Sequence, residues 1–107
     1  ASAQQQIDSA IGESSATGQG FALLLLDLDR FRTINEGLGY ECGDAVLCEV
    51  AQRLQRALAV EDSISHAGGD RFLILARSAR SPITAAQLAE RLLRELREPF
   101  WLAAILD

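Results

Sequence analysis

Two hydrophobic patterns alternate along the chain and together predict a sheet covered by helices. A continuous apolar run at Phe21–Leu26, ended by Asp27, is typical of a strand buried on both faces. Apolar residues recur every three or four positions between 46 and 58 and again between 85 and 96. This spacing predicts two amphipathic helices, each with one apolar face toward the sheet.

The polar residues at the ends of these segments predict where the helices begin. We expect Asp44 to cap the first long helix and Thr84, with Gln87 three residues later, to cap the second. A shorter helix is expected at Phe31–Leu38, because glycines at 37 and 39 would end it.

The segment between the two long helices predicts a β-hairpin. Ser63–Ala67 and Arg71–Ala76 both favour strands, and Gly68, Gly69 and Asp70 separate them. Tight turns between antiparallel strands require positive φ, which glycine adopts most easily. The order strand, helix, hairpin, helix therefore indicates an α/β (α+β) fold, with a central antiparallel hairpin and helices packed on the sheet.

The composition is that of one globular domain and narrows the range of functions. The chain has 107 residues and a net charge of −5, so we expect neither nucleic-acid binding nor membrane insertion. There is no lysine and a single histidine, His66, which excludes P-loops, lysine chemistry and histidine-rich metal sites. Cys42 and Cys48 lie on different faces of one expected helix, and two reduced thiols fit a cytoplasmic location.

Residues 1–20 are rich in Gln, Ser, Ala and Gly and have no strong pattern. We expect the end of a helix in Ala1–Ile11 and a flexible connection over Gly12–Gly20. The domain itself is expected over 21–107, with Phe100–Leu106 opening another extended or irregular segment.

Two acidic features, one at a strand end and one at a turn, are candidates for chemistry. Asp27 and Asp29 close the first strand, and carboxylates at a strand end are a common way to hold Mg²⁺ against phosphate oxygens. Asp70 follows two glycines whose bare backbone lets a ligand approach closely. Each feature also has a purely structural interpretation, because Asp27 and Asp29 can solvate a strand end and the glycines can simply form a turn.

Taken together, the segment from Asp27 to Asp44 and the later Gly68-Gly-Asp-Arg-Phe72 resemble a GGDEF domain. The resemblance extends from about Phe21 to Phe100 and implies a ferredoxin-like fold related to nucleotide cyclases and polymerase palms. It implies diguanylate cyclase chemistry, in which two GTP give cyclic di-GMP and two pyrophosphates. Family members extend beyond both ends of this sequence, so the resemblance also implies a domain truncated at both ends.

The resemblance assigns roles to individual residues. Asp27, the carbonyl of Leu28 and Asp70 would hold Mg²⁺, and Asp70 would also activate the attacking 3′-hydroxyl. The other implied contacts are Arg32 to phosphate, Asn35 and Asp44 to guanine, Tyr40 to ribose or base in place of a common histidine, and Gly68 and Gly69 to the phosphates.

The sequence departs from the family pattern at the signature itself. Arg71 stands where the fourth signature residue is normally glutamate. Upstream, the family's inhibitory product site uses Arg-x-x-Asp, but this chain has Ala59-Val-Glu-Asp62, and His66 replaces a second product-binding arginine. Feedback inhibition through that site is therefore not expected.

These departures favour a degenerate GGDEF domain that is regulatory, with a partial GTP and Mg²⁺ site and little or no cyclase activity. The resemblance implies an adjacent EAL-type phosphodiesterase or sensor domain, in the cytoplasm or the cytoplasmic part of a membrane-attached protein. The first alternative is an active diguanylate cyclase, which would work as a homodimer because each protomer holds one GTP. A receiver-like phosphoacceptor domain is the second alternative.

Overall fold

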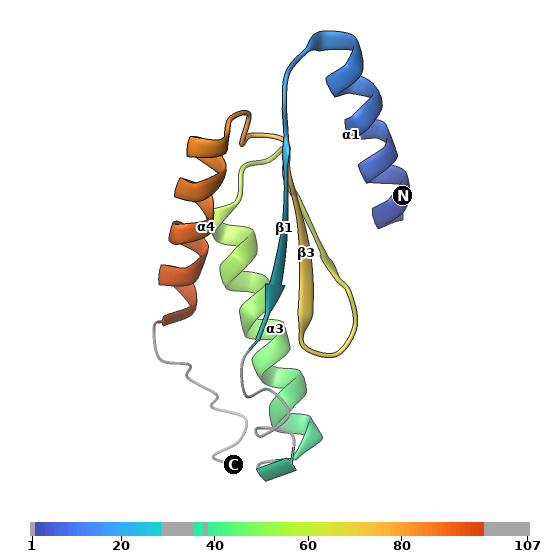
Figure 1. Cartoon of the computed structure of the whole chain (residues 1–107). Helices are drawn as coiled ribbons and strands as arrows, with labels where there is room; N and C mark the ends of the chain where they lie inside the picture. The colour runs from blue at the N-terminus through green and yellow to red at the C-terminus, as the bar shows by residue number, and fades with distance from the viewer. Residues whose placement is uncertain (1, 29–35, 38, 98–107) are drawn as a thin grey trace.

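The computed structural model describes residues 2–28, 36–37 and 39–97, with the backbone alone at 40–42. It contains an antiparallel sheet whose one face is covered by two long helices, while a third helix lies on the opposite side (Figure 1). This arrangement confirms the predicted fold class. The elements in chain order are α1 (Ala3–Thr17), β1 (Ala22–Asp27), α3 (Tyr40–Ala57), β2 (Ser63–His66), β3 (Arg71–Ala76) and α4 (Pro82–Arg97).

The hairpin forms as the glycine pattern predicts, and β3 becomes the central strand of the order β1-β3-β2. In β2 and β3, His66 pairs with Phe72. On its other side β3 pairs with β1, where Leu24 lies opposite Ile74 and Asp27 opposite Arg71. This register places the end of β1 beside the hairpin turn.

The prediction that the first strand is buried on both faces was wrong, because β1 is covered well on one face only. Its side chains alternate between partly buried and exposed. Leu24 and Leu26 pack against the core, whereas Leu23 is 46% exposed and Leu25 is 61% exposed. The helices α3 and α4 cover only one face of the sheet, and among the described elements α1 covers only part of the other (Figure 1).

The core lies between the sheet and the two long helices. The apolar stripes predicted for α3 and α4 face inward and meet β3 there. Leu54 of α3 and Ile74 of β3 are completely buried. The other buried members of this cluster are Val50, Phe72, Ala76, Ala79, Leu88 and Leu92.

Helix α3 begins four residues before the predicted cap. Gly39 is the N-cap, with a φ of 93°, and Asp44 lies inside the helix rather than at its start. The prediction chose the nearest carboxylate because polar side chains usually cap helices. Here the chain enters the helix through a positive-φ glycine, without any side-chain cap bond.

The predicted capping box of α4 is shifted by three residues. Ser81 Oγ accepts from the backbone N–H of Thr84 at 3.2 Å, and Thr84 Oγ1 accepts from the N–H of Ser81 at 3.0 Å. Ser81 is therefore the capping residue, Pro82 opens the helix and Thr84 closes the box. Proline suits this first position because it has no N–H to leave unpaired.

Helix α1 is longer than expected and includes residues 12–17 of the segment predicted to be flexible. It runs through Gly12 and ends with Gly18 in the left-handed conformation, at a φ of 75°. A capping box between Ser2 and Gln5 fixes its start. One glycine inside a helix costs about 1 kcal/mol, which end caps and contacts with the sheet can offset.

Two predicted segments lie wholly or largely outside the described residues. Of the short helix expected at 31–38, only Glu36 and Gly37 are described, and both are helical. The segment expected at 100–106 is not described at all. Within the described part of the chain, none of the helices combines the length and the apolar character needed to cross a membrane.

Candidate functional site

The candidate site lies where β1 ends beside the hairpin turn. The backbone N–H of Leu28 donates to the carbonyl of Asp70 at 2.9 Å, and Asp27 immediately precedes Leu28. The fold thus places the three residues predicted to hold a metal at the same end of the sheet. Their role as metal ligands stays a prediction from the sequence.

The turn has the conformation that its glycines were expected to provide. Gly68 has a φ of 100° and Gly69 a φ of 53°, and the N–H of Arg71 donates to the Gly68 carbonyl at 3.0 Å. A Cβ added at either glycine would meet nothing within 4 Å. The glycines are therefore needed for their backbone angles, and the space around the turn is open to a ligand.

His66 supports this turn from the end of β2. Its Nε2 lies 2.8 Å from the Gly69 carbonyl, so that nitrogen carries the proton and donates. The imidazole also stacks on Phe72, with the ring centroids 5.0 Å apart. The sequence placed His66 beside the turn, but its hydrogen bond across the turn becomes evident only in the structure.

Arg71 forms an ion pair with Asp27, one of the residues predicted to hold the metal. Its Nε lies 3.1 Å from Oδ1 of Asp27, and the two residues are paired in the β1–β3 register. Both side chains are more than half exposed, so the pair adds at most about 1 kcal/mol to stability. The ion pair matters mainly for the site, because it holds the positive charge of Arg71 beside the carboxylate of Asp27.

The described residues do not fit the Mg²⁺ site that the resemblance implies. Mg²⁺ binds carboxylate oxygens at about 2.1 Å, so an ion on Oδ1 of Asp27 would lie within about 5 Å of the Arg71 guanidinium. Even in bulk water, repulsion at that distance costs about 2 kcal/mol.

The other predicted nucleotide contacts are placed only in part. Arg32 and Asn35 lie outside the described residues, and Tyr40 opens α3 with only its backbone described. Asp44 is exposed on the early part of α3. The predicted guanine and phosphate contacts of these residues stay predictions.

The acidic residue of the implied product site has a structural role. Asp62 accepts hydrogen bonds from the N–H of Ala59 at 3.0 Å, the N–H of Ser78 at 2.9 Å and the hydroxyl of Ser78 at 2.7 Å. These bonds tie the end of the loop after α3 to the segment after β3. Both oxygens of Asp62 are thus engaged within the fold, and the absence of inhibition through this stretch stays a prediction from the sequence.

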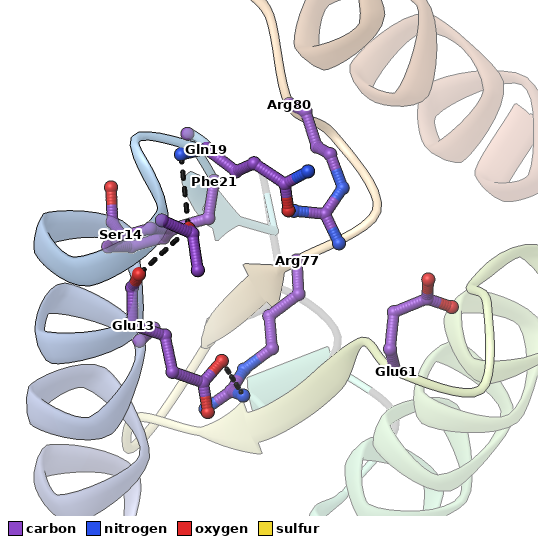
Figure 2. A pocket seen from close by; sticks show the side chains of 10 residues that line it. Glu13, Ser14, Gln19, Phe21, Glu61, Arg77 and Arg80 are labelled. Carbon is purple, nitrogen blue, oxygen red and sulfur yellow. Dashed lines mark hydrogen bonds and ion pairs between the residues drawn. The ribbon is translucent and has the colours of Figure 1, made fainter.

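A pocket of about 320 Å³ lies at the opposite end of the sheet, between α1 and the segment after β3. Figure 2 shows Arg77 reaching toward Glu13 of α1, with Arg80 near Gln19 and Glu61 across the opening. Arg77 Nη1 lies 2.9 Å from Glu13 Oε2, and Arg80 Nη1 donates to Gln19 Oε1 at 2.6 Å. The two arginines therefore already have acceptors, and the pocket separates α1 from the sheet.

Helix α1 is held against the sheet largely by polar contacts. Besides the Arg77–Glu13 ion pair, Ser63 Oγ donates to Gln6 Oε1 at 3.1 Å. Ala10 is the one buried residue of the helix. A helix with so little apolar burial is expected to open more readily than the core.

We therefore predict that Glu13→Gln loosens α1 selectively. Losing this partly exposed ion pair should speed amide hydrogen exchange in α1 by about two- to fivefold, with little change in α3. The control is Asp8→Asn, because the side chain of Asp8 accepts a hydrogen bond within the helix, from Gln4. Equal acceleration in the two variants would show that the contact with Arg77 does not hold the helix.

The comparisons with known proteins agree on one family. The family described as "Diguanylate cyclase, GGDEF domain" matches residues 1–105. The chain is 37% identical over 95 residues to the bifunctional diguanylate cyclase/cyclic di-GMP phosphodiesterase MucR of Pseudomonas aeruginosa. That alignment covers 89% of this chain but 14% of MucR, so the chain spans only a small part of this relative.

Solved structures show the same arrangement of strands and helices. The GGDEF domain of YfiN (TpbB) from Pseudomonas aeruginosa matches with a TM-score of 0.90 and 29% identity, over 94% of this chain and 62% of that one. A sensory box/GGDEF family protein from Caulobacter crescentus matches with a TM-score of 0.83 and 35% identity, over 94% and 65%. Since the family match spans nearly the whole sequence and these folds agree, the chain belongs to the GGDEF family of diguanylate cyclase domains.

Proposed function

We propose that this chain is a catalytically impaired GGDEF domain, which binds a guanine nucleotide and regulates a cyclic di-GMP signalling protein. The observation that carries this proposal is the ion pair between Arg71 and Asp27 at 3.1 Å. It puts a cation where the cyclase reaction needs an anionic ligand for a metal.

The chemistry explains why this change impairs the reaction. Diguanylate cyclase activity joins the 3′-oxygen of one GTP to the α-phosphorus of another and releases pyrophosphate. Metal ions held by carboxylates normally lower the cost of forming that alkoxide and of separating the pyrophosphate. Because Arg71 pairs with Asp27, Asp70 is the one predicted carboxylate ligand that has no ion pair among the described residues.

Nucleotide binding has requirements different from those of catalysis, and in our proposal it is retained despite the ion pair between Arg71 and Asp27. The turn at Gly68 and Gly69 is open to a ligand and has its backbone angles set. Asp44 is exposed, and its carboxylate suits the N1–H and amino group of guanine. Arg32 and Asn35 complete the proposed site as phosphate and guanine contacts on the strength of the family resemblance.

The proposed regulatory role rests on the domain combinations found among relatives. MucR is described as combining cyclase and phosphodiesterase activities in one protein. We propose that this domain likewise acts beside an EAL-type phosphodiesterase or a sensor domain in the cytoplasm. Nucleotide occupancy would then be the signal that it passes on, whereas an active cyclase would require pairing of two protomers.

A product assay tests the proposal. Purified full-length protein incubated with GTP and Mg²⁺ should form no detectable cyclic di-GMP, whereas Arg71→Glu should form measurable product. Arg97→Glu makes the same charge change on an exposed residue of α4 and should stay inactive. Product formation by the unmodified protein, at the rate of a GGDEF cyclase assayed alongside, would overturn the proposal in favour of an active enzyme.

A further inference from the structure

We propose that the guanidinium of Arg71 replaces a divalent cation in this domain. In this arrangement it bridges Asp27 and a phosphate oxygen of the bound nucleotide, so that the domain takes its nucleotide without a metal. The inference rests on the proposed nucleotide site and specifies how its phosphates are held.

The geometry of the ion pair leaves part of the guanidinium available. Arg71 reaches Asp27 through Nε, while its side chain is 58% exposed. A guanidinium has five N–H donors in a planar fork, so one edge can bind a carboxylate while the other binds a phosphate. A metal ion in a nucleotide site joins the same two kinds of anion, which is why the replacement is chemically possible.

The turn beside Arg71 offers further donors. Within the described ranges, no hydrogen bond engages the backbone N–H groups of Gly69 and Asp70. The space around both glycines of the turn is open, because a Cβ placed on either one would have no neighbour within 4 Å. Backbone N–H groups in open turns are common phosphate partners, and here they adjoin the arginine.

The charge of Asp70 distinguishes this arrangement from a metal site. If a divalent cation lay between Asp70 and the phosphates, the carboxylate would strengthen binding, and removing its charge would weaken it. If Arg71 takes the place of the divalent cation, Asp70 and the phosphates are like charges with no metal ion between them. Removing the charge of Asp70 should then strengthen binding, so the two arrangements predict opposite signs.

The test is calorimetric titration of GTP into the purified full-length protein, in EDTA and in Mg²⁺. We expect the dissociation constant of the unmodified protein to agree within about twofold in the two buffers. Asp70→Asn should bind GTP about fivefold more tightly in EDTA. This is the effect expected from removing the repulsion between two unit charges, one on Asp70 and one on the phosphates, about 4 Å apart in water. Arg71→Glu should bind only with Mg²⁺, and Arg97→Glu should match the unmodified protein.

Three outcomes would overturn the inference: loss of GTP binding in EDTA, weaker binding by Asp70→Asn, or no GTP binding in either buffer. The comparison of GTP binding in EDTA and in Mg²⁺ uses the unmodified protein, so it does not depend on the folding of any variant. Failure of the proposed function is distinguishable, because cyclic di-GMP in the product assay would refute the impaired catalysis, and absence of GTP binding in both buffers would refute the proposed nucleotide site itself. A protein that needs Mg²⁺ to bind GTP but makes no product would refute only the metal-free mode of binding.

Discussion

Replacing Leu54 by alanine is expected to lower the free energy of unfolding by about 3 kcal/mol, because the truncation leaves a cavity in the centre of the core. Leu54 is completely buried on α3 and belongs to the cluster that joins α3, β3 and α4. The surrounding side chains come from three different elements, so they can close the cavity only in part. Urea unfolding followed by circular dichroism measures the change.

The matched control is the same substitution at Leu25, whose side chain is 61% exposed on the outer face of β1. Leu25→Ala should change the unfolding free energy by less than about 1 kcal/mol. Equal losses at the two positions would mean that the outer face of the sheet is covered in the full protein. In that case, the exposure of Leu25 in this structure would not describe its environment in solution.

The comparison between Leu54 and Leu25 also shows which parts of the fold local patterns can predict. The helical stripe that contains Leu54 identifies a buried face because its period matches the helix. The run that contains Leu25 is apolar throughout, so it cannot reveal that only one face of β1 is covered by α3 and α4. That coverage depends on where α1 packs, which the sequence before residue 20 does not encode in a hydrophobic pattern.

Helix ends are harder to predict for a related reason. Asp44 and Thr84 are good capping residues by type, yet Gly39 and Ser81 take the positions. A cap is decided by where the chain turns into the helix, and that point depends on the preceding connection. For α1, the Ser2–Gln5 capping box lies at the first residues of the chain, where it does not stand out among other polar residues.

The candidate site could be located from sequence, but its electrostatics could not. Motif spacing indicated that Asp27 and the turn around Asp70 belong together, and the fold brings them to one end of the sheet. The identity of Arg71 signalled a changed charge. Its pairing with Asp27 depends on the register between β1 and β3, which is fixed by the packing of the whole sheet.

Arg53→Met is expected to lower the free energy of unfolding by about 2 kcal/mol, although methionine keeps much of the apolar stem. Arg53 is a buried arginine on α3, 7% exposed, and its Nη1 donates to the carbonyl of Glu95 at 3.0 Å. That carbonyl lies in the last turn of α4, where carbonyls generally lack an intrahelical donor. The variant leaves this carbonyl and the carboxylate of Glu49, 3.1 Å from Arg53 Nε, without their donor.

Arg56→Met provides the matched control, since Arg56 lies on the same helix 3.8 Å from the same Glu49 oxygen but is 64% exposed. Its loss should cost less than about 0.5 kcal/mol and should vanish in about 1 M salt, which screens exposed ion pairs. The loss at Arg53 should persist in high salt, because a buried hydrogen bond to a carbonyl is screened little. If salt removed both effects equally, Arg53 would be contributing only surface charge, and the packing of α3 against α4 would not depend on its bond to Glu95.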